Sequence, residues 1–313
     1  MLDVIDFLLR TPPAPLPVLD SLASWWQQHR ALGERFSAPA DVALAGGFCA
    51  DRLGYAFGSG YQAAGQALLE AAGVPVSSAE LTALCATEAG GAHPRAIEAT
   101  LRAEQGGGYR LDGEKRFVTF GSEARRLLVV ASVASAGSDG AGRKDLRLCV
   151  VRADQPGVEV EPLPALPMVP EIPHARVRFE AVSVAAAHVC PGDGYTRYLK
   201  PFRTIEDVHV HAALLGWLLR LARAARWPAP LADELLAACV AAYALCGGDA
   251  SAPSLHVALA ALIARARVLV EAAAEQMDGE TRDRFERDRP LLDVASKARA
   301  RRLEVAREKL GAW

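Results

Sequence analysis

The sequence predicts an α+β protein with a helical N-terminal region, a central antiparallel β domain and a C-terminal helical bundle. Apolar residues recur at helical spacing before residue 80 and again after residue 195. Between these positions, short strand-like runs are separated by turn residues. We therefore expect a short N-terminal helical region over 1–80, a middle β sandwich or barrel over 81–190, and a helical bundle over 195–313.

The N-terminal region predicts two helices. In Val18–Leu32, the residues Leu19, Leu22 and Trp25 recur at helical spacing. Asp51–Ala72 also carries its apolar residues on or near one face, although glycines within it weaken the helical pattern.

The middle region predicts eight short strands. They are Leu84–Glu88, Ala99–Glu104, Tyr109–Leu111, Arg116–Phe120, Leu127–Val133, Leu146–Val151, Val158–Glu161 and Ala175–Phe179. Asp112-Gly113 predicts a turn between two of them, and Ala134–Asp145 predicts a Gly/Ser-rich loop. Many short strands at this spacing are typical of a compact antiparallel sandwich or barrel.

The C-terminal region predicts a bundle of long helices. Leu255–Met277 has one wide apolar stripe, and Leu291–Leu310 has a basic outer face that we expect to be solvated. Leu231–Cys246 is apolar nearly all round, so we expect it to be buried. One short bundle should not need so much apolar surface, which predicts a homodimer or a larger assembly.

Composition narrows the functional class. The chain has 313 residues and is 51% hydrophobic and 23% charged, which is typical of a globular protein. Its net charge of −2 lacks the basic excess of a nucleic-acid-binding protein. The six cysteines lie far apart with no C-x-x-C pair, as in reduced cytosolic proteins. Acidic residues near the N-terminus are unlike a signal peptide, and no uncharged stretch is long enough to span a bilayer. We expect a cytoplasmic protein without a membrane or nucleic-acid partner.

The sequence matches several known catalytic and binding motifs only in part. Gly108 and Gly113 followed by Glu114-Lys115 imitate a phosphate-binding loop, but the lysine is displaced and the setting is a hairpin. Glu206-x-x-His209 is the pair used in di-iron bundles, but no second pair occurs. Zinc-ligand spacing is also absent from the sequence, so we expect no metal site. The sequence contains no nucleophile elbow either.

The segment Leu84–Ala124 carries the strongest signal. It contains L-C-A-T-E-A-G-G-A-H, then A-T-L-R-A, then G-G-G-Y-R-L-D-G-E-K-R-F-V-T-F-G-S-E-A. This resembles the β domain of the acyl-CoA dehydrogenase family, in which T-E-P-x-A-G-S-D precedes a hairpin ending in G-x-K-x-[W/F]-I-T-N. The strand that begins at Arg176, the glycine turn at Val189–Gly194 and the helix start I-E-D-V-H-V-H-A-A-L-L-G also resemble family blocks, in the same order.

The resemblance implies an FAD-dependent oxidoreductase that transfers a hydride from an acyl-CoA to the flavin. Such a flavin needs polar groups at its pyrimidine edge and near N5, and an apolar wall. By resemblance, Thr87 contacts the pyrimidine edge, Thr119 lies near N5, and Phe117 packs beside the ring system. Leu84 and Ala86 would line the same pocket. The alternative is that both threonines are ordinary strand residues and that Phe117 is core.

Dehydrogenation of a thioester also needs a base that takes the α-proton. In the isovaleryl- and long-chain-type members, the base occupies the L-E-R position, where this chain has Glu206. The neighbouring Asp207 should raise the pKa of Glu206 by like-charge repulsion. The alternative is a glutamate favoured only by the helix dipole.

The chain departs from the family pattern at several places. Ala92 and His93 replace the serine and aspartate of G-S-D, Phe120 replaces an asparagine, and Asp207 replaces an arginine. The following helix lacks the R-x-x-F-G segment, and Trp313 precedes the expected G-G-x-G segment that completes FAD binding. These departures predict a shortened, divergent member with a weak or partial FAD site. They leave open a non-catalytic relative that acts as scaffold or as partner subunit of a full-length acyl-CoA dehydrogenase.

Overall fold

The structure is a computed structural model, and it describes residues 1–14, 17–74, 79–91, 93–133 and 144–311. Ala92 and most of the predicted loop Ala134–Asp145 lie outside the described residues. The chain divides into two compact units. The helical unit comprises residues 1–67, 166–171 and 203–313, and the sheet unit comprises residues 68–165 and 172–202. The predicted boundaries at 80, 190 and 195 stay predictions.

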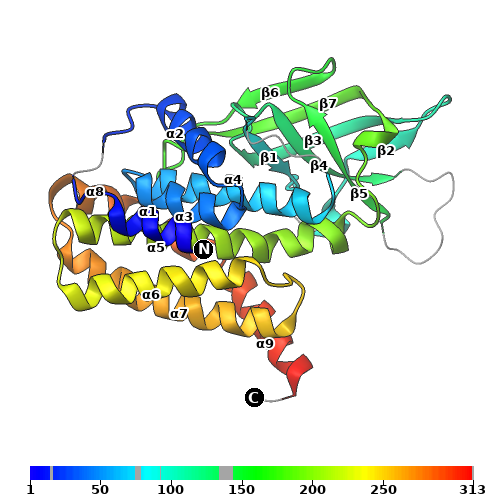
Figure 1. Cartoon of the computed structure of the whole chain (residues 1–313). Coiled ribbons are helices and arrows are strands. Elements are labelled where there is room, and N and C mark those ends of the chain that lie inside the picture. Colours follow the sequence, from blue (N-terminus) through cyan, green and yellow to red (C-terminus); the bar gives the residue numbers. More distant parts are fainter. Residues whose placement is uncertain (15–16, 75–78, 92, 134–143, 312–313) are drawn as a thin grey trace. The chain divides into compact units, whose positions relative to one another are not determined.

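Helices fill both regions that were predicted to be helical, and Leu2–Arg10, Pro39–Cys49 and Gly279–Asp288 are helices that no pattern had located (Figure 1). The helices are α1 (Leu2–Arg10), α2 (Leu22–Arg35), α3 (Pro39–Cys49), α4 (Leu53–Ala71), α5 (Lys200–Ala224), α6 (Ala229–Cys246), α7 (Pro253–Gln276), α8 (Gly279–Asp288) and α9 (Ser296–Leu310). The first predicted helix begins later than expected, because the side chain of Ser21 caps α2 by accepting a hydrogen bond from the Ser24 backbone. The stripe predicted on α7 is buried from Leu255 to Ala274.

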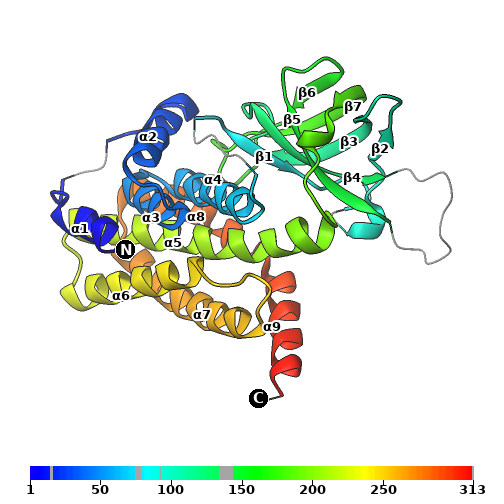
Figure 2. The same ribbon diagram turned by 45° about the vertical axis from the view of Figure 1, so that its right-hand side comes forward.

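The helices of the helical unit pack with their backbones in close contact at glycines. α3 and α5 lie side by side (Figure 2), and a Cβ added at Gly47 would lie 1.9 Å from the carbonyl oxygen of Ala213. Gly216 of α5 approaches the Leu44 carbonyl in the same way, and Gly60 of α4 approaches Val210. Gly60, one of the glycines that weakened the helical pattern, is therefore needed for helix packing.

A Gly47→Ala variant is expected to lose about 3 kcal/mol of stability, because neither helix backbone can yield to the added methyl group. Gly65→Ala is the matched control, since Gly65 also lies inside a helix but an added Cβ meets nothing within 4 Å. The control should be neutral or stabilised by up to about 1 kcal/mol. Urea unfolding measures both values, and equal midpoints for Gly47→Ala and the wild type would contradict this packing.

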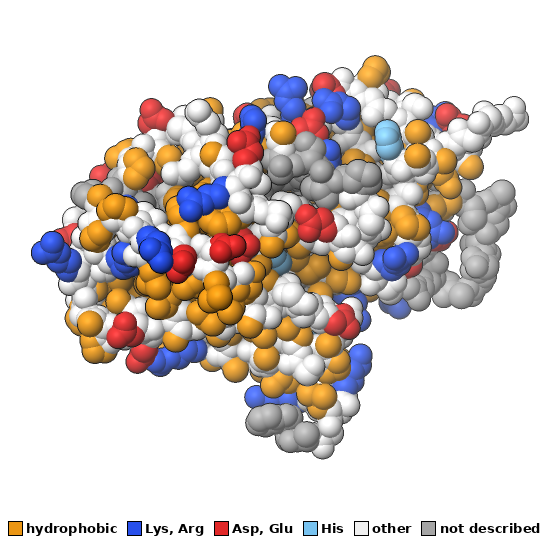
Figure 3. Space-filling model, viewed as in Figure 1, with side chains coloured by type: hydrophobic (Ala, Val, Ile, Leu, Met, Phe, Trp, Pro, Cys, Tyr) orange, Lys and Arg blue, Asp and Glu red, His pale blue; other side chains and the backbone are white. Residues whose placement is uncertain are grey.

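Helix α6 does not have the burial predicted for it. The expectation that Leu231–Cys246 is buried is wrong for the single chain, because only Leu235, Ala238, Cys239 and Ala242 of α6 are buried. By length and composition alone α6 could cross a membrane, a test that core helices of soluble proteins also pass, yet 22% of it is buried. Hydrophobic side chains are visible on the surface where α6 runs (Figure 3). Most exposed positions of α6 are alanines, such as Ala237, Ala241 and Ala244, while Asp233 and Glu234 are exposed near its start.

The sheet unit is built on one seven-stranded sheet (Figure 1). Its strands are β1 (Thr82–Cys85), β2 (Thr100–Ala103), β3 (Tyr109–Thr119), β4 (Arg126–Val133), β5 (Leu146–Arg152), β6 (Val158–Pro162) and β7 (His174–Val184). Their order is β1-β4-β2-β3-β7-β6, and β5 pairs with β4. The expectation of an antiparallel domain is wrong in part, because β4 runs parallel to β1 and to β2 while the other pairings are antiparallel.

The turn predicted at Asp112-Gly113 is also wrong. These residues lie inside the continuous strand β3, at a register shift between Leu111 and Gly113. Gly113 has a φ of 141°, which glycine tolerates, and Asp112 accepts a hydrogen bond from the backbone of Ala181 on β7 (2.8 Å). The Asp-Gly pair therefore makes a bulge that keeps β3 paired with β7.

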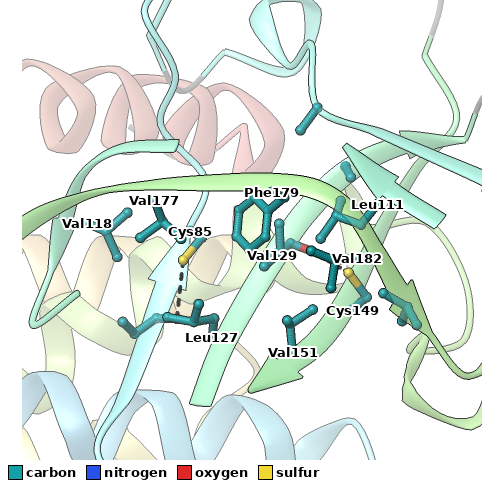
Figure 4. Close-up of a cluster of buried hydrophobic side chains, with 14 of the residues drawn as sticks. Cys85, Leu111, Val118, Leu127, Val129, Cys149, Val151, Val177, Phe179 and Val182 are labelled. Carbon is teal, nitrogen blue, oxygen red and sulfur yellow. Dashed lines mark hydrogen bonds between the residues drawn. The ribbon is translucent and has the colours of Figure 1, made fainter. Parts of the chain in front are cut away.

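The core of the sheet unit is made of small and branched side chains from β1, β3, β4, β5 and β7 (Figure 4). Cys85, Val129, Cys149 and Val177 are fully buried there. Burial disfavours the thiolate and so raises the pKa values of the Cys85 and Cys149 thiols, which makes both cysteines inert packing residues. This core gives the ends of β1 and β3 a rigid support.

Candidate functional site

The site lies where β1 and β3 end, within the sheet unit. The segment after β1 carries Ala86, which is buried, and Thr87, which is partly exposed. The carbonyl oxygen of Thr87 accepts a hydrogen bond from the backbone N–H of Arg116 (2.9 Å). This bond places Thr87 beside the last residues of β3. Leu84 of β1 is partly exposed, and its neighbours Ala83 and Cys85 point into the core, so Leu84 lies on the other face of the strand.

An irregularity in β3 turns Phe117 outward. The register with β7 shifts between Lys115 and Val118, both of which are buried. Between them Phe117 has a φ of 55° and is 60% exposed. A bulky residue in the left-handed region is strained, and bulges of this kind re-aim side chains next to functional sites. The alternative of a core phenylalanine is therefore wrong, and an aromatic face is presented to solvent or to a ligand.

Thr119 is the last residue of β3 and is partly exposed. Its Oγ1 lies 3.4 Å from Nε2 of His174, its register partner on β7. The next residue, Phe120, also has a positive φ (61°). The hydroxyl therefore sits between two strained aromatic residues at the strand end.

A buried ion pair anchors both strand ends. Lys115 is 0% exposed, and its Nζ donates to Oε1 of Glu88 (2.6 Å) and to the carbonyl of Val130 (2.5 Å). The Glu88 carboxylate also accepts from the backbone N–H groups of Glu98 (2.6 Å) and Ala99 (3.1 Å). Because Glu88 follows Thr87 and Lys115 precedes Phe117 by two residues, the pair holds both sides of the site.

Glu206, the predicted base, belongs to the helical unit. It lies on α5, whose residues Val208, Ala212 and Leu215 are buried as predicted. Its side chain is partly exposed, yet the surrounding protein desolvates the carboxylate and raises its pKa to about 7. The like charge of Asp207 adds to this rise, as expected, and is the smaller cause.

Asp207 has internal partners that the sequence did not reveal. Its carboxylate accepts hydrogen bonds from Arg299 (2.7 and 2.9 Å) and Arg302 (2.5 Å), both on α9. Asp207 is 6% exposed, so its charge is neutralised inside the helical unit. The nearby His209 donates from Nδ1 to the carbonyl of Ile205 (2.8 Å), one turn earlier on its own helix.

Sequence reasoning missed three residues of the site: Glu88, Lys115 and His174. A signal for Lys115 existed, because period-two alternation in β3 from Leu111 directs residue 115 inward. An inward lysine requires a partner, and Glu88 is an acid at the end of a neighbouring strand. No comparable signal marks His174, since strand pairing alone brings it opposite Thr119.

Two partly exposed threonines and an exposed aromatic ring, at the ends of β1 and β3, suit a flat ligand with an apolar face and a polar edge. The sequence of residues 83–182, which contains this arrangement, matches the family model described as acyl-CoA dehydrogenase, middle domain. Residues 83–182 therefore form a middle domain of the acyl-CoA dehydrogenase type, within a fold of the same kind. No curated protein matches the chain in sequence.

Solved structures of this family share the fold over nearly the whole chain. One is a probable acyl CoA dehydrogenase from Mycobacterium abscessus, with 17% identity, a TM-score of 0.58, and coverage of 90% of this chain and 97% of that one. Butyryl-CoA dehydrogenase from Megasphaera elsdenii gives 14% identity, a TM-score of 0.65, and coverage of 97% and 89%. PigA with FAD and proline gives 14% identity, a TM-score of 0.67, and coverage of 99% and 96%. At these identities the likeness establishes the acyl-CoA dehydrogenase fold.

Proposed function

We propose that the chain is an FAD-dependent oxidoreductase that introduces an α,β double bond into an acyl thioester, an acyl-CoA or a related compound. The observation that carries the proposal is the outward turn of Phe117, which strains the backbone and exposes a phenyl ring two residues before Thr119. Strain of this kind persists where a ligand site requires it. The match of residues 83–182 to the acyl-CoA dehydrogenase middle domain supports a flavin as this flat ligand.

In this proposal the sheet unit holds the flavin ring. Thr87 binds the pyrimidine edge, Thr119 lies near N5, and Phe117 packs beside the ring, with Leu84 and Ala86 lining the pocket. When bound, FAD supplies the acceptor for the hydride that leaves the β-carbon of the substrate. The Glu88–Lys115 pair keeps the two hydroxyls in place while the substrate reacts.

Glu206 would act as the base. It takes the proton from the α-carbon while the hydride leaves the β-carbon, and the two electrons of the α C–H bond become the new double bond. A carboxylate with a pKa of about 7 is ionised in part of the molecules at neutral pH, and it binds the proton more firmly than an ordinary glutamate.

Flavin binding is the direct test of this site. Titration of the flavin-free protein with FAD and with FMN should show saturable quenching of flavin fluorescence, with micromolar or weaker affinity. Weak binding is expected because the segment that holds the adenosine half in the family is not recognisable after α5. Phe117→Ala should weaken binding, and its fold should be intact because the ring is exposed. Protein that binds neither flavin would favour the non-catalytic scaffold instead.

The alanine-rich exposed face of α6 supports an assembled state. We propose a homo-oligomer, or a hetero-oligomer with a longer homologue, in which this face is covered. The proposal also places the protein in the cytoplasm, in keeping with a soluble family and with six unpaired cysteines.

A further inference from the structure

The hydroxyl of Thr119 and the imidazole of His174 form a short relay at the edge of the candidate site. Oγ1 of Thr119 lies 3.4 Å from Nε2, and Nδ1 of the same ring lies 3.0 Å from the carbonyl oxygen of Ile172. The two residues face each other in the register of β3 and β7, and Phe120 N–H donates to the Pro173 carbonyl (2.7 Å) just beyond them. The backbone therefore fixes how the two side chains meet.

The direction of the hydrogen bond between Thr119 and His174 follows from the bond that His174 makes to the carbonyl oxygen of Ile172. A carbonyl oxygen only accepts hydrogen bonds, so Nδ1 of His174 carries the hydrogen. Burial lowers the pKa of His174, which keeps the ring neutral at pH 7. In a neutral ring with hydrogen on Nδ1, Nε2 has only a lone pair. The hydroxyl of Thr119 must then donate to Nε2, and it has only lone pairs left for a ligand.

We propose that His174 is a positioning residue that makes Thr119 a hydrogen-bond acceptor and thereby selects a ligand with an N–H group at that point. The inference rests on the proposed function, in which that point is N5 of the flavin. Oxidised flavin has a lone pair at N5, whereas reduced flavin has an N–H. His174 thus favours the reduced cofactor and makes the bound flavin a stronger oxidant of the acyl thioester.

The tautomer is tested on the flavin-free protein. Long-range ¹H–¹⁵N correlation of labelled protein at pH 7 assigns the protonated nitrogen of His174, with His174→Gln identifying the signal. We expect hydrogen on Nδ1 and a bare Nε2. Hydrogen on Nε2 would overturn the inference, whatever the flavin does.

The effect on the ligand is measured as the affinity for reduced FAD divided by that for oxidised FAD, obtained from the midpoint potential of bound and free flavin. His174→Phe removes the acceptor, and the ratio should fall about threefold to tenfold, the worth of one hydrogen bond. A tenfold fall corresponds to about 30 mV for a two-electron couple. His174→Gln offers an amide oxygen as acceptor and should restore most of the ratio.

A second background separates this role from a merely structural one. In Thr119→Val protein, His174→Phe should leave the ratio unchanged, because the hydroxyl that it orients is gone. An equal fall with and without Thr119 would overturn the inference while leaving flavin binding intact. If the wild type bound no flavin at all, the proposed function would fail, and the ligand-selection claim with it, whereas the tautomer experiment would still report on the relay.

Discussion

Flavin reduction by an acyl thioester is expected to slow by about 10²–10⁴-fold when Glu206 is replaced by glutamine. The amide cannot take the α-proton, and it has nearly the shape of the carboxylate, so fold and FAD affinity should be unchanged. The measurement is the rate of anaerobic bleaching of bound flavin after mixing with a panel of acyl-CoAs. Glu275→Gln, an exposed glutamate on α7, is the control and should react at the wild-type rate.

The pH dependence of the same rate follows from the raised pKa of Glu206. The base works only when ionised, so the rate should rise with pH and level off above about 7, the pKa raised mainly by burial. If the base were a glutamate with the ordinary pKa of 4.5, the same rise in rate would occur near pH 4.5. Equal rates for Glu206→Gln and the wild type would dismiss Glu206 as the base.

A second large effect is expected from Lys115→Met, which should lower the free energy of unfolding by about 3–5 kcal/mol. The substitution leaves the Glu88 carboxylate buried beside an apolar side chain. Burial already lowers the pKa of Lys115, and Glu88 opposes that fall, so the ammonium depends on this partner. Urea unfolding followed by circular dichroism measures the loss.

Two further variants show whether burial of the charges causes that loss of stability. Glu88→Gln combined with Lys115→Met removes both charges and keeps an oxygen for the backbone N–H groups of Glu98 and Ala99, so most of the stability should return. Arg178→Met breaks an ion pair with Glu159 that is as short (2.6 Å) but exposed, and it should cost about 1 kcal/mol at most. Similar losses for Lys115→Met and Arg178→Met would show that burial does not set the worth of the pair.

The sequence was sufficient to predict the alternation of helical and sheet regions, because side-chain periodicity depends on which face of an element is buried. It was not sufficient for strand direction. Short apolar strands look alike whether their neighbours run parallel or antiparallel, so the parallel pairing of β4 with β1 and β2 was missed. Asp112-Gly113 was misread because the same dipeptide suits a turn and a bulge, and only the bond from Ala181 distinguishes them.

The candidate site shows the same limit. Phe117 and Thr119 were found by family resemblance, but the strain that exposes Phe117 depends on a register shift that only the paired strands define. The sequence showed Asp207 only as a replacement for an arginine, yet Arg299 and Arg302 neutralise its charge from a helix far along the chain. Long-range pairs of this kind leave no local pattern.

We propose that this chain oxidises an acyl thioester with bound FAD. The most direct measurement is anaerobic mixing of FAD-loaded protein with short-, medium- and long-chain acyl-CoAs while flavin absorbance and the 2-enoyl product are recorded. We expect bleaching of the flavin and one equivalent of enoyl thioester per flavin for at least one substrate. FAD-loaded protein that is not reduced by any of these thioesters would contradict the proposal.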